Sequence, residues 1–443
     1  MKKSLTEGSI LKSMILFALP LILGNMLQQL YNVVDTYIVG HFLGANALAG
    51  VGASYSIVTF ITSLILGLCM GAGVLFSMLY GAKRDKELKN SFVISFVFIG
   101  VISVLIMGLS ISFVDPLLKF LNVPNDIYVL TRNYIVIIFY GIFFTFLYNY
   151  FASLLRALGD SKTPLLFLGI STISNIILDI TFILYISKSV KSVAYATIIS
   201  QAISAIFMIV YTLHKKKEYV PYKEHCYLDK RIFNKFISYS LLTCIQQSVM
   251  NFGIMLVQGI VNSFGVTVMA GFSTAVKIDT LAYMPVQDFG NAFSTFVAQN
   301  KGANKEDRVN KGLKYACIVS ILFCIVISSV IYMFAENFMM IFLNVNEIEA
   351  ISVGVQYLRI EGACYIGIGL LFLWYGYYRG IGKPFISVIL TVISLGTRVI
   401  LSYTLSNISA IGVLGIWWSI PIGWFLADVT GLFYYLYKRH KAL

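Results

Sequence analysis

Charged residues are scarce in this sequence. They make up 12% of the 443 residues, whereas soluble domains carry about 25%. Hydrophobic residues reach 58% of the chain. This balance excludes a water-soluble globular protein.

Motifs for metals and disulfides are also lacking. The six cysteines show no CxxC spacing, and five of them fall inside apolar stretches, which indicates reduced core residues. The four histidines lie in predicted loops or in the tail, without the spacing of metal ligands. No paired nucleophile and base stands out either. We therefore expect that the protein is not an enzyme and needs no cofactor besides a coupling ion.

Long apolar runs dominate what is present. Crossing a hydrocarbon core of ~30 Å takes about 20 mostly apolar residues in a helix. The runs lack the alternation of barrel strands, so helices must satisfy the backbone. The sequence predicts an all-α polytopic membrane protein with twelve transmembrane helices. The runs cover residues 14–38, 51–80, 91–114, 128–155, 164–187, 193–213, 236–263, 267–298, 315–335, 351–378, 384–405 and 411–437.

The basic residues are unevenly placed. Counting from the N-terminus, alternate connections between the runs hold 26 of the 33 Lys and Arg residues, and the opposite set holds four. This bias predicts a multi-pass protein of the cell membrane with both termini in the cytoplasm. A nucleic-acid-binding protein would group its charges on one soluble face. Despite the net charge of +13, we expect no nucleic-acid partner.

The chain resembles itself across its two halves. Three matches that include loop residues occur in the same order in both halves, which indicates an internal duplication. The matches are ALAGVG (47–52) with VMAGFS (268–273), YGAKRDKELKN (80–90) with KGANKEDRVNK (301–311), and RALGDSKTP (156–164) with RGIGKP (379–384).

The longest hydrophilic stretch, residues 214–231, separates these halves. We predict an amino-terminal lobe of six helices at 1–213, a cytoplasmic linker at 214–235, and a carboxyl-terminal lobe of six helices at 236–443. Both halves start on the same side, so the repeat is parallel. Two six-helix bundles of this kind are expected to bracket a central cleft.

Asp35 lies inside the first apolar run. A carboxylate at membrane depth costs about 2.5–3.5 kcal/mol on insertion scales, so its position indicates a function. Gln28, Tyr31 and Asn32 share its helix face. Interhelical packing alone could account for Gln28, whereas the charge of Asp35 favours an ion or proton site.

A second acid, Asp179, lies in the fifth run with Asn175 one turn before it. Thr197 and Gln201 of the sixth run add polar groups. The amino half has no intramembrane cation, and an unpaired carboxyl in apolar surroundings gains proton affinity. Carboxylates, an amide and a hydroxyl could equally hold a small hard cation such as Na⁺ at Asp35 and Asp179. The residues leave H⁺ and Na⁺ open.

The carboxyl half has not kept these acids. At the repeat offset, Asp35, Asp179 and Thr197 correspond to residues without a carboxyl or hydroxyl group. Those residues are Leu256, Ile400 and Trp418. Its own polar residues in the seventh and eighth runs include Gln246, Gln247, Gln258, Lys277, Asp279, Gln287 and Asp288.

Two roles remain open for these polar residues of the carboxyl half. The acids Asp279 and Asp288 could form structural ion pairs with Lys277, Arg359 or Arg398, or they could serve substrate passage. Pro285 and Gly290 predict a bend or break in the eighth run.

Aromatic and methionine side chains suit adaptable binding of flat, apolar, often cationic molecules. Five of them fall on runs expected to flank the cleft. They are Tyr31, Tyr140, Phe146, Met250 and Phe252.

Several motifs resemble transporters of the MATE (multidrug and toxic compound extrusion) family. They are FALPLILGNMLQQLYNVVDTYIVGHFLGANALAGVG at the start, RALGDSKTP, NIILD, YATIISQ and VAQNKGANKEDRV. The resemblance implies a pair of six-helix bundles that exports drug-like organic cations in exchange for H⁺ or Na⁺. It carries an ion site onto Asp35, Asn175, Asp179, Thr197 and, more loosely, Asn149.

The carboxyl half departs from one branch of that family. Some members place acids on the seventh and tenth helices, where this chain has Gln246, Gln247 and Met250, and where Glu361 falls outside the family spacing. We therefore expect reliance on the amino-half carboxylates. The chain is interpreted as a monomeric multidrug efflux antiporter in the lipid bilayer, with small organic substrates. A flippase for lipid-linked oligosaccharides is the first alternative, and a channel or receptor is the second.

Overall fold

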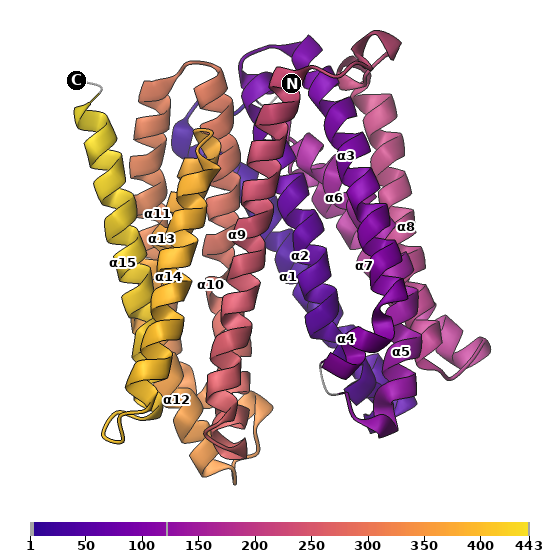
Figure 1. Cartoon of the computed structure of the whole chain (residues 1–443), viewed down its shortest axis with the longest axis vertical. Coiled ribbons are helices and arrows are strands. Elements are labelled where there is room, and N and C mark those ends of the chain that lie inside the picture. Colours follow the sequence, from indigo (N-terminus) through magenta and orange to yellow (C-terminus); the bar gives the residue numbers. More distant parts are fainter. Residues whose placement is uncertain (1–3, 121–122, 442–443) are drawn as a thin grey trace. The chain divides into compact units, whose positions relative to one another are not determined.

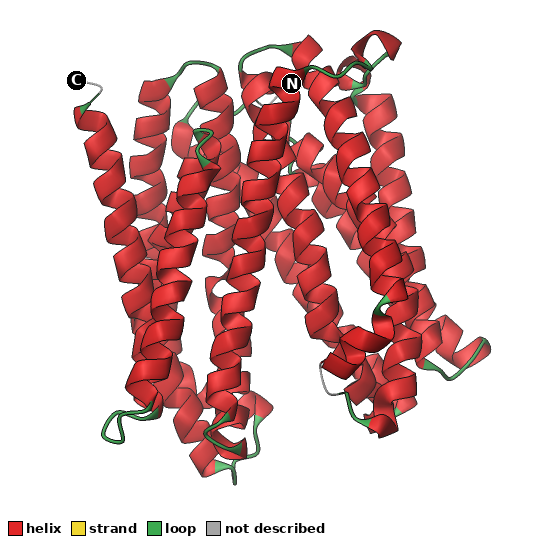
Figure 2. Cartoon of the chain, in the orientation of Figure 1, coloured by secondary structure: helices red, strands yellow, loops and turns green. Residues whose placement is uncertain are grey.

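The computed structural model describes residues 4–120 and 123–441. Within these ranges every regular element is a helix (Figure 2). Figure 1 labels the α-helices in chain order. They are α1 (Ile10–Leu43), α2 (Ala45–Gly81), α3 (Asp85–Ser112), α4 (Val114–Phe120), α5 (Asn125–Tyr140), α6 (Ile142–Ala157), α7 (Lys162–Tyr185), α8 (Val190–Lys215), α9 (Lys230–Asn262), α10 (Val266–Gly302), α11 (Glu306–Phe342), α12 (Ile348–Ala363), α13 (Tyr365–Gly380), α14 (Pro384–Ser406) and α15 (Val413–His440), with short 3₁₀ turns at Lys217–Tyr219 and Lys223–His225.

Each predicted apolar run coincides with one helix or one bent pair. Among the described residues, nine helices are long and apolar enough to cross a membrane, and two bent pairs add two more spans. The pair α5 and α6 bends by 43°, and the pair α12 and α13 by 55°. The remaining run, the eighth, is α10, a 37-residue helix with mean hydropathy lowered by Lys277, Asp279 and Asp288. The all-helical membrane fold is thereby confirmed.

Of the bend or break predicted in the eighth run, the break is wrong. Helix α10 continues through Pro285 and Gly290. A proline removes one backbone hydrogen bond and crowds the preceding turn, but neighbouring helices can hold such a helix together. Bends of 43° and 55° occur instead at Gly141, between α5 and α6, and at Cys364, between α12 and α13.

Backbone geometry supports the internal duplication. Gly44 (φ 86°) and Gly265 (φ 95°) precede α2 and α10 at matching positions. Lys83 (φ 56°) and Asn304 (φ 55°) take the left-handed conformation in the matching turns before α3 and α11. Residues other than glycine rarely adopt this backbone conformation. Its recurrence at equivalent turns therefore indicates that both halves follow the same chain path.

The helix starts also refine one correspondence between the halves. Val190 begins α8 and Val413 begins α15. This register matches Thr197 with Ile420 rather than with Trp418, which the fixed offset gave. The same offset of 223 already relates Asn125 to Ile348 and Gly159 to Gly382, so the shift arises before α5 and α12. Ile420 is also apolar, so the hydroxyl of Thr197 still lacks a counterpart.

The chain divides into two compact units. Unit 1 contains residues 1–4 and 19–244, and unit 2 contains residues 5–18 and 245–443. Helix α1 thus begins in unit 2 and continues in unit 1, while α9 begins in unit 1 and continues in unit 2.

Unit 1 has an aromatic core on α2, α3 and α6. Tyr150 is fully buried, and its hydroxyl contacts Ser95 at 2.8 Å and donates to the backbone oxygen of Phe92 at 2.6 Å. Phe76 and Phe146 pack against its ring with centroids 6.0 and 5.7 Å away. This core fixes α6 against α3. Helix α5, which precedes α6 in the chain, lies closer to the acids described below.

In unit 2, the segment before α1 is held by the first turn of α11. The guanidinium of Arg308 donates to the backbone oxygens of Leu5, Glu7 and Gly8, at 3.2, 2.8 and 2.7 Å. The Asn300 side chain adds a donor to Leu5 O at 3.2 Å. These contacts fix the start of the helix that later carries Asp35.

Candidate functional site

Asp35 on α1 and Asp179 on α7 meet inside unit 1. Their relative exposures are 8% and 0%. The two carboxyl groups lie within hydrogen-bonding reach of each other. In the described part of the chain, neither forms an ion pair with a Lys, Arg or His side chain. Two carboxyl groups in such contact cannot both stay ionised without a proton or cation between them.

A polar network connects Asp179 to α8 and back to α1. In the orientation that satisfies both ends of its amide, Asn175 donates from Nδ2 to Asp179 Oδ2 at 2.8 Å. Its amide oxygen then accepts from the backbone N–H of Thr197 at 3.3 Å. The hydroxyl of Thr197 donates to Val193 O at 3.1 Å and lies 3.4 Å from the hydroxyl of Tyr31. Residues of α1, α7 and α8 therefore form one polar network.

Apolar side chains enclose this network. A buried cluster that includes Ile38, Ile183 and Val193 surrounds it on α1, α7 and α8. Inside that cluster, Asp35 Oδ1 and Asp179 Oδ1 are buried without a hydrogen-bond partner. Buried polar atoms are nearly always paired, so these oxygens are the places where a proton, water or small cation can bind.

Sequence reasoning missed Tyr134 on α5. It is 8% exposed and lies close enough to Asp35, Tyr31 and Asp179 for electrostatic interaction. A tyrosine in an apolar run carries no insertion penalty comparable to that of an acid. The sequence therefore offered no signal that singled it out from the other 27 tyrosines.

The other residues assigned to unit 1 lie around or away from this network. Asn149 is half-buried, and its Nδ2 donates to Thr145 O at 2.8 Å, within its own helix. Gln201 Oε1 accepts from the Thr145 hydroxyl at 3.3 Å. Asn32 donates to Gln29 at 3.5 Å along α1.

Three further residues of this set have different surroundings. Gln28 and Tyr140 are exposed. Phe146 is fully buried in the aromatic core, so its side chain serves packing instead of a binding surface. An aromatic residue in an apolar helix suits both roles, and only packing separates them.

Unit 2 contains a second buried acidic cluster. Asp279 on α10 and Glu361 on α12 are 3% and 2% exposed, and both lie near Arg398 on α14. The hydroxyl of Tyr357 donates to Asp279 Oδ2 at 3.4 Å, and Tyr365 also contacts Asp279. The cation from a third helix compensates part of the charge. No ion pair links Asp279 to Arg398 in the described part of the chain, so the role of Asp279, structural or in substrate passage, stays a prediction.

The remaining cations assigned to such pairs lie elsewhere. Lys277 is exposed. Successive residues of a helix are rotated by about 100°, so Lys277 and Asp279, two positions apart, lie on different faces of α10. Arg359 is exposed and stacks over the ring of Tyr332 at 5.6 Å. Neither is therefore the partner of Asp279.

The other unit 2 residues of the predicted substrate set differ in burial. Asp288 and Gln246 are buried, at 3% and 1% exposure. Gln247 and Met250 are half-buried, and Phe252 is exposed. Their assignment to a substrate cavity stays a prediction.

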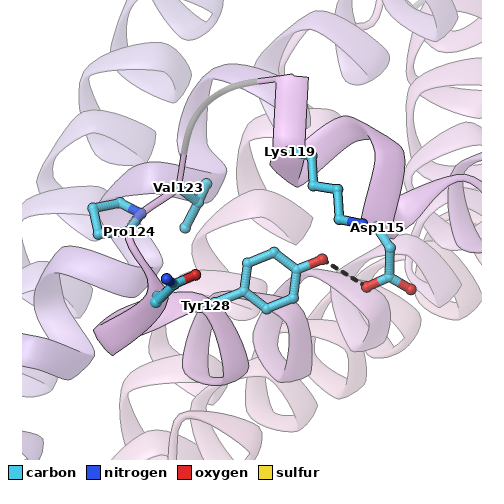
Figure 3. A pocket seen from close by; sticks show the side chains of 6 residues that line it. Asp115, Lys119, Val123, Pro124 and Tyr128 are labelled. Carbon is cyan, nitrogen blue, oxygen red and sulfur yellow. Dashed lines mark hydrogen bonds between the residues drawn. The ribbon is translucent and has the colours of Figure 1, made fainter.

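A surface hollow of about 780 Å³ in unit 1 shares no lining residue with either acidic cluster (Figure 3). Asp115, Lys119, Pro124 and Tyr128 line it. The Tyr128 hydroxyl donates to Asp115 at 2.9 Å. The guanidinium of Arg132 donates to the same carboxyl and holds the pKa of Asp115 below its usual value. Its acid is thus satisfied by two donors.

Comparison with known proteins decides the family. The MatE family model matches the chain twice, over residues 20–181 and 243–404. The chain belongs to the MATE family. The double match repeats across the two halves, in agreement with the internal duplication. It also confirms the resemblance read from the sequence motifs.

Named relatives extend over nearly the whole chain. It is 31% identical over 447 residues to "Probable multidrug resistance protein YpnP" of Bacillus subtilis, covering 99% of this chain and 97% of that protein. It is 26% identical to "Probable multidrug resistance protein NorM" of Thermotoga maritima, covering 92% and 88%. Both relatives are named for multidrug resistance.

Solved structures show the same fold. One, described as the outward-facing conformation of a multidrug resistance MATE family transporter, gives a TM-score of 0.92 at 22% identity. That match covers 99% of this MATE chain and 97% of the other. A MATE crystal structure in complex with MaD3S gives 0.89 at 22% identity, with 99% and 98% covered. These matches establish the twelve-helix, two-lobe fold class.

Proposed function

We propose that this MATE protein exports small organic, often cationic, amphipathic compounds from the cytoplasm, driven by antiport of a cation through alternating access. The proposal includes a monomer in the cell membrane with both termini cytoplasmic. It requires no cofactor beyond the coupling ion and no enzymatic step. The relatives named for multidrug resistance support the substrate class.

One observation carries the coupling mechanism. Asp35 and Asp179 are buried carboxyl groups in mutual reach, with no cationic side chain paired to either. Such a pair binds one positive charge and releases it when the surroundings change. Because Asp35 lies on α1 and Asp179 on α7, loading that charge draws two helices together, and releasing it lets them separate.

The contact between the two carboxyl groups favours a proton over Na⁺ as that charge. A sodium ion needs several oxygen ligands. A proton needs only the two carboxyl groups.

The flippase alternative loses support from the carboxyl half. A site for pyrophosphate-linked sugars would gather cations. Lys277 and Arg359 are exposed, and Arg398 lies beside two acids. These three residues do not supply a common cluster of free positive charge.

Efflux from proteoliposomes tests the proposal. Vesicles loaded with ethidium, a flat aromatic cation, are given a pH gradient alone or a Na⁺ gradient alone. We expect the pH gradient to drive ethidium movement and the Na⁺ gradient to leave it at the leak rate. Transport driven by Na⁺ alone would refute the assignment of the proton.

The Asp35→Asn variant tests the role of the site under the same conditions. We expect it to fold and reconstitute but to move ethidium at the leak rate under either gradient. Asp126→Asn, an exposed acid at the start of α5, is the matched control and should behave like the wild type. Wild-type transport by Asp35→Asn would show that coupling does not use this carboxyl.

A further inference from the structure

Helix α3 and the segment before α9 form an apolar groove of about 410 Å³ within unit 1. Its side on α3 runs from Val93 to Ile102, and residues 226–228 make the opposite side. Phe98 and Phe233 join the two sides through an edge-to-face contact, with ring centroids 6.1 Å apart. The groove therefore has a rigid apolar lining.

The segment that forms one side is held in place. The side chain of Asn90 on α3 donates to the backbone oxygens of His225 and Tyr227, at 2.9 and 2.7 Å. Tyr227 and Leu228 nevertheless remain 55% and 64% exposed. They belong to the most hydrophilic stretch of the chain. Large apolar side chains fixed in an exposed position indicate that another apolar group covers them.

Positive charge lies at one end of this groove. Lys89 is one helical turn before Val93, and Lys230 is three residues before Phe233, so each lysine shares the face of its helix with a lining residue. The ammonium of Lys89 lies 5.2 Å from the ring centre of Tyr222. Both lysines belong to connections that the charge bias assigns to the cytoplasm.

The length of the groove fits one leaflet. From Val93 to Ile102 helix α3 rises by about 13 Å, close to half of the ~30 Å hydrocarbon core. An apolar channel of that length with cations at its cytoplasmic end complements a lipid that has an acyl chain and an anionic headgroup.

We propose that this groove binds one anionic phospholipid of the cytoplasmic leaflet, with an acyl chain along α3 and the phosphate near Lys89 and Lys230. The site goes beyond the antiport mechanism. It rests on the proposed orientation in the membrane and does not depend on ion coupling. Loss of transport in the acid variants would therefore leave it untouched.

Native mass spectrometry of the full chain, purified in a mild detergent, tests the site. Dioleoylphosphatidylglycerol and dioleoylphosphatidylcholine are added at equal concentrations. We expect one phosphatidylglycerol to be retained with about a 25-fold preference, since each lysine near a headgroup contributes about fivefold. Equal retention of the two lipids would overturn the proposal.

Two variants separate the acyl-chain contact from the headgroup contact. Val97→Trp places a large ring in the groove at a position that is 57% exposed, so the fold should tolerate it. It should reduce lipid retention at least tenfold. The double variant Lys89→Gln/Lys230→Gln should keep a bound lipid but bring the preference close to one. An unchanged preference in the double variant would contradict the headgroup assignment.

Matched changes in unit 2 provide the controls. Val326→Trp replaces a valine on α11 that is 63% exposed. Lys311→Gln/Lys314→Gln removes two exposed lysines of the same helix. Both should retain phosphatidylglycerol as the wild type does. A thermal melt of each variant establishes that it is folded. Lipid loss in the controls equal to that in the groove variants would overturn a specific site.

Discussion

Replacing Asn175 with leucine removes the amide that links Asp179 to α8. The side chain is 1% exposed, and its bonds to Asp179 Oδ2 and to the backbone N–H of Thr197 measure 2.8 and 3.3 Å. Leucine keeps the branching and the number of heavy atoms of asparagine, and its methyl groups are larger than the amide atoms, so the change removes hydrogen bonding without leaving a cavity. The variant therefore isolates the polar contribution of this residue.

The magnitude follows from the charge state of Asp179. A hydrogen bond to a charged group is worth about 1.5–3 kcal/mol, which corresponds to about 10- to 150-fold in an equilibrium constant. The amide donates to the ionised carboxylate, the state that exists between release of one coupling ion and binding of the next. We expect Asn175→Leu to slow gradient-driven ethidium efflux by a factor in this range.

A second asparagine in the same unit supplies the control. Asn149 is half-buried and donates to Thr145 O within its own helix, at 2.8 Å. The resemblance carried the ion site onto Asn149 only loosely, and Asn149→Leu makes the same chemical change while it removes no contact to an acid. It should retain at least half of the wild-type efflux in the same vesicles, with equal amounts of protein reconstituted.

The comparison can refute the reasoning in two ways. Equal losses in Asn175→Leu and Asn149→Leu would mean that the effect does not come from the bond to Asp179. Wild-type efflux by Asn175→Leu would mean that its bond to Asp179 plays no part in ion exchange. A melting experiment on both variants excludes unfolding as the cause.

Three further predictions concern stability. Arg398→Leu removes the cation beside two buried acids and should lower the unfolding free energy by about 3–5 kcal/mol, whereas Arg359→Leu at an exposed site should change it by less than about 1 kcal/mol; thermal melting in detergent compares them. Gly71→Ala places a methyl group against the backbone of α9 and should cost about 1–3 kcal/mol, while Gly52→Ala meets no atom within 4 Å and should melt like the wild type. The lowered pKa of Asp115 means that its ion pair stabilises the fold above the usual carboxyl pKa of about 3.9. This contribution is lost as the pH falls through the lowered value. Asp115→Asn should therefore reduce the pH dependence of melting curves measured on either side of that window.

The sequence predicted the fold class because the signals involved are local. Each run of apolar residues reports its own cost of membrane insertion, and each loop reports its own charge. The twelve runs therefore coincide with helices or bent pairs, and the duplication recurs in the positive φ angles of Lys83 and Asn304. The break expected at Pro285 failed, because proline weakens a helix only by an amount that packing can offset.

The candidate site was predictable in part for the same reason. Asp35 and Asp179 could be recognised from the sequence because a single acid in an apolar run already carries a high cost of membrane insertion. Tyr134 and Glu361 did not stand out as members of clusters. A tyrosine is ordinary in such a helix, and the role of Glu361 depends on Asp279 and on a cation from another helix.

By itself, then, the sequence determined the membrane class, the repeat and the identity of the two amino-half acids, since insertion cost and hydropathy are properties of single segments. Only the tertiary structure decided which helix faces meet. Packing brings Asp35 against Asp179 and turns the Asn175 amide toward the acid. Packing also buries Phe146 in the aromatic core and leaves Lys277 exposed. Contacts between distant segments depend on how helices rotate against one another, and no local pattern records that rotation.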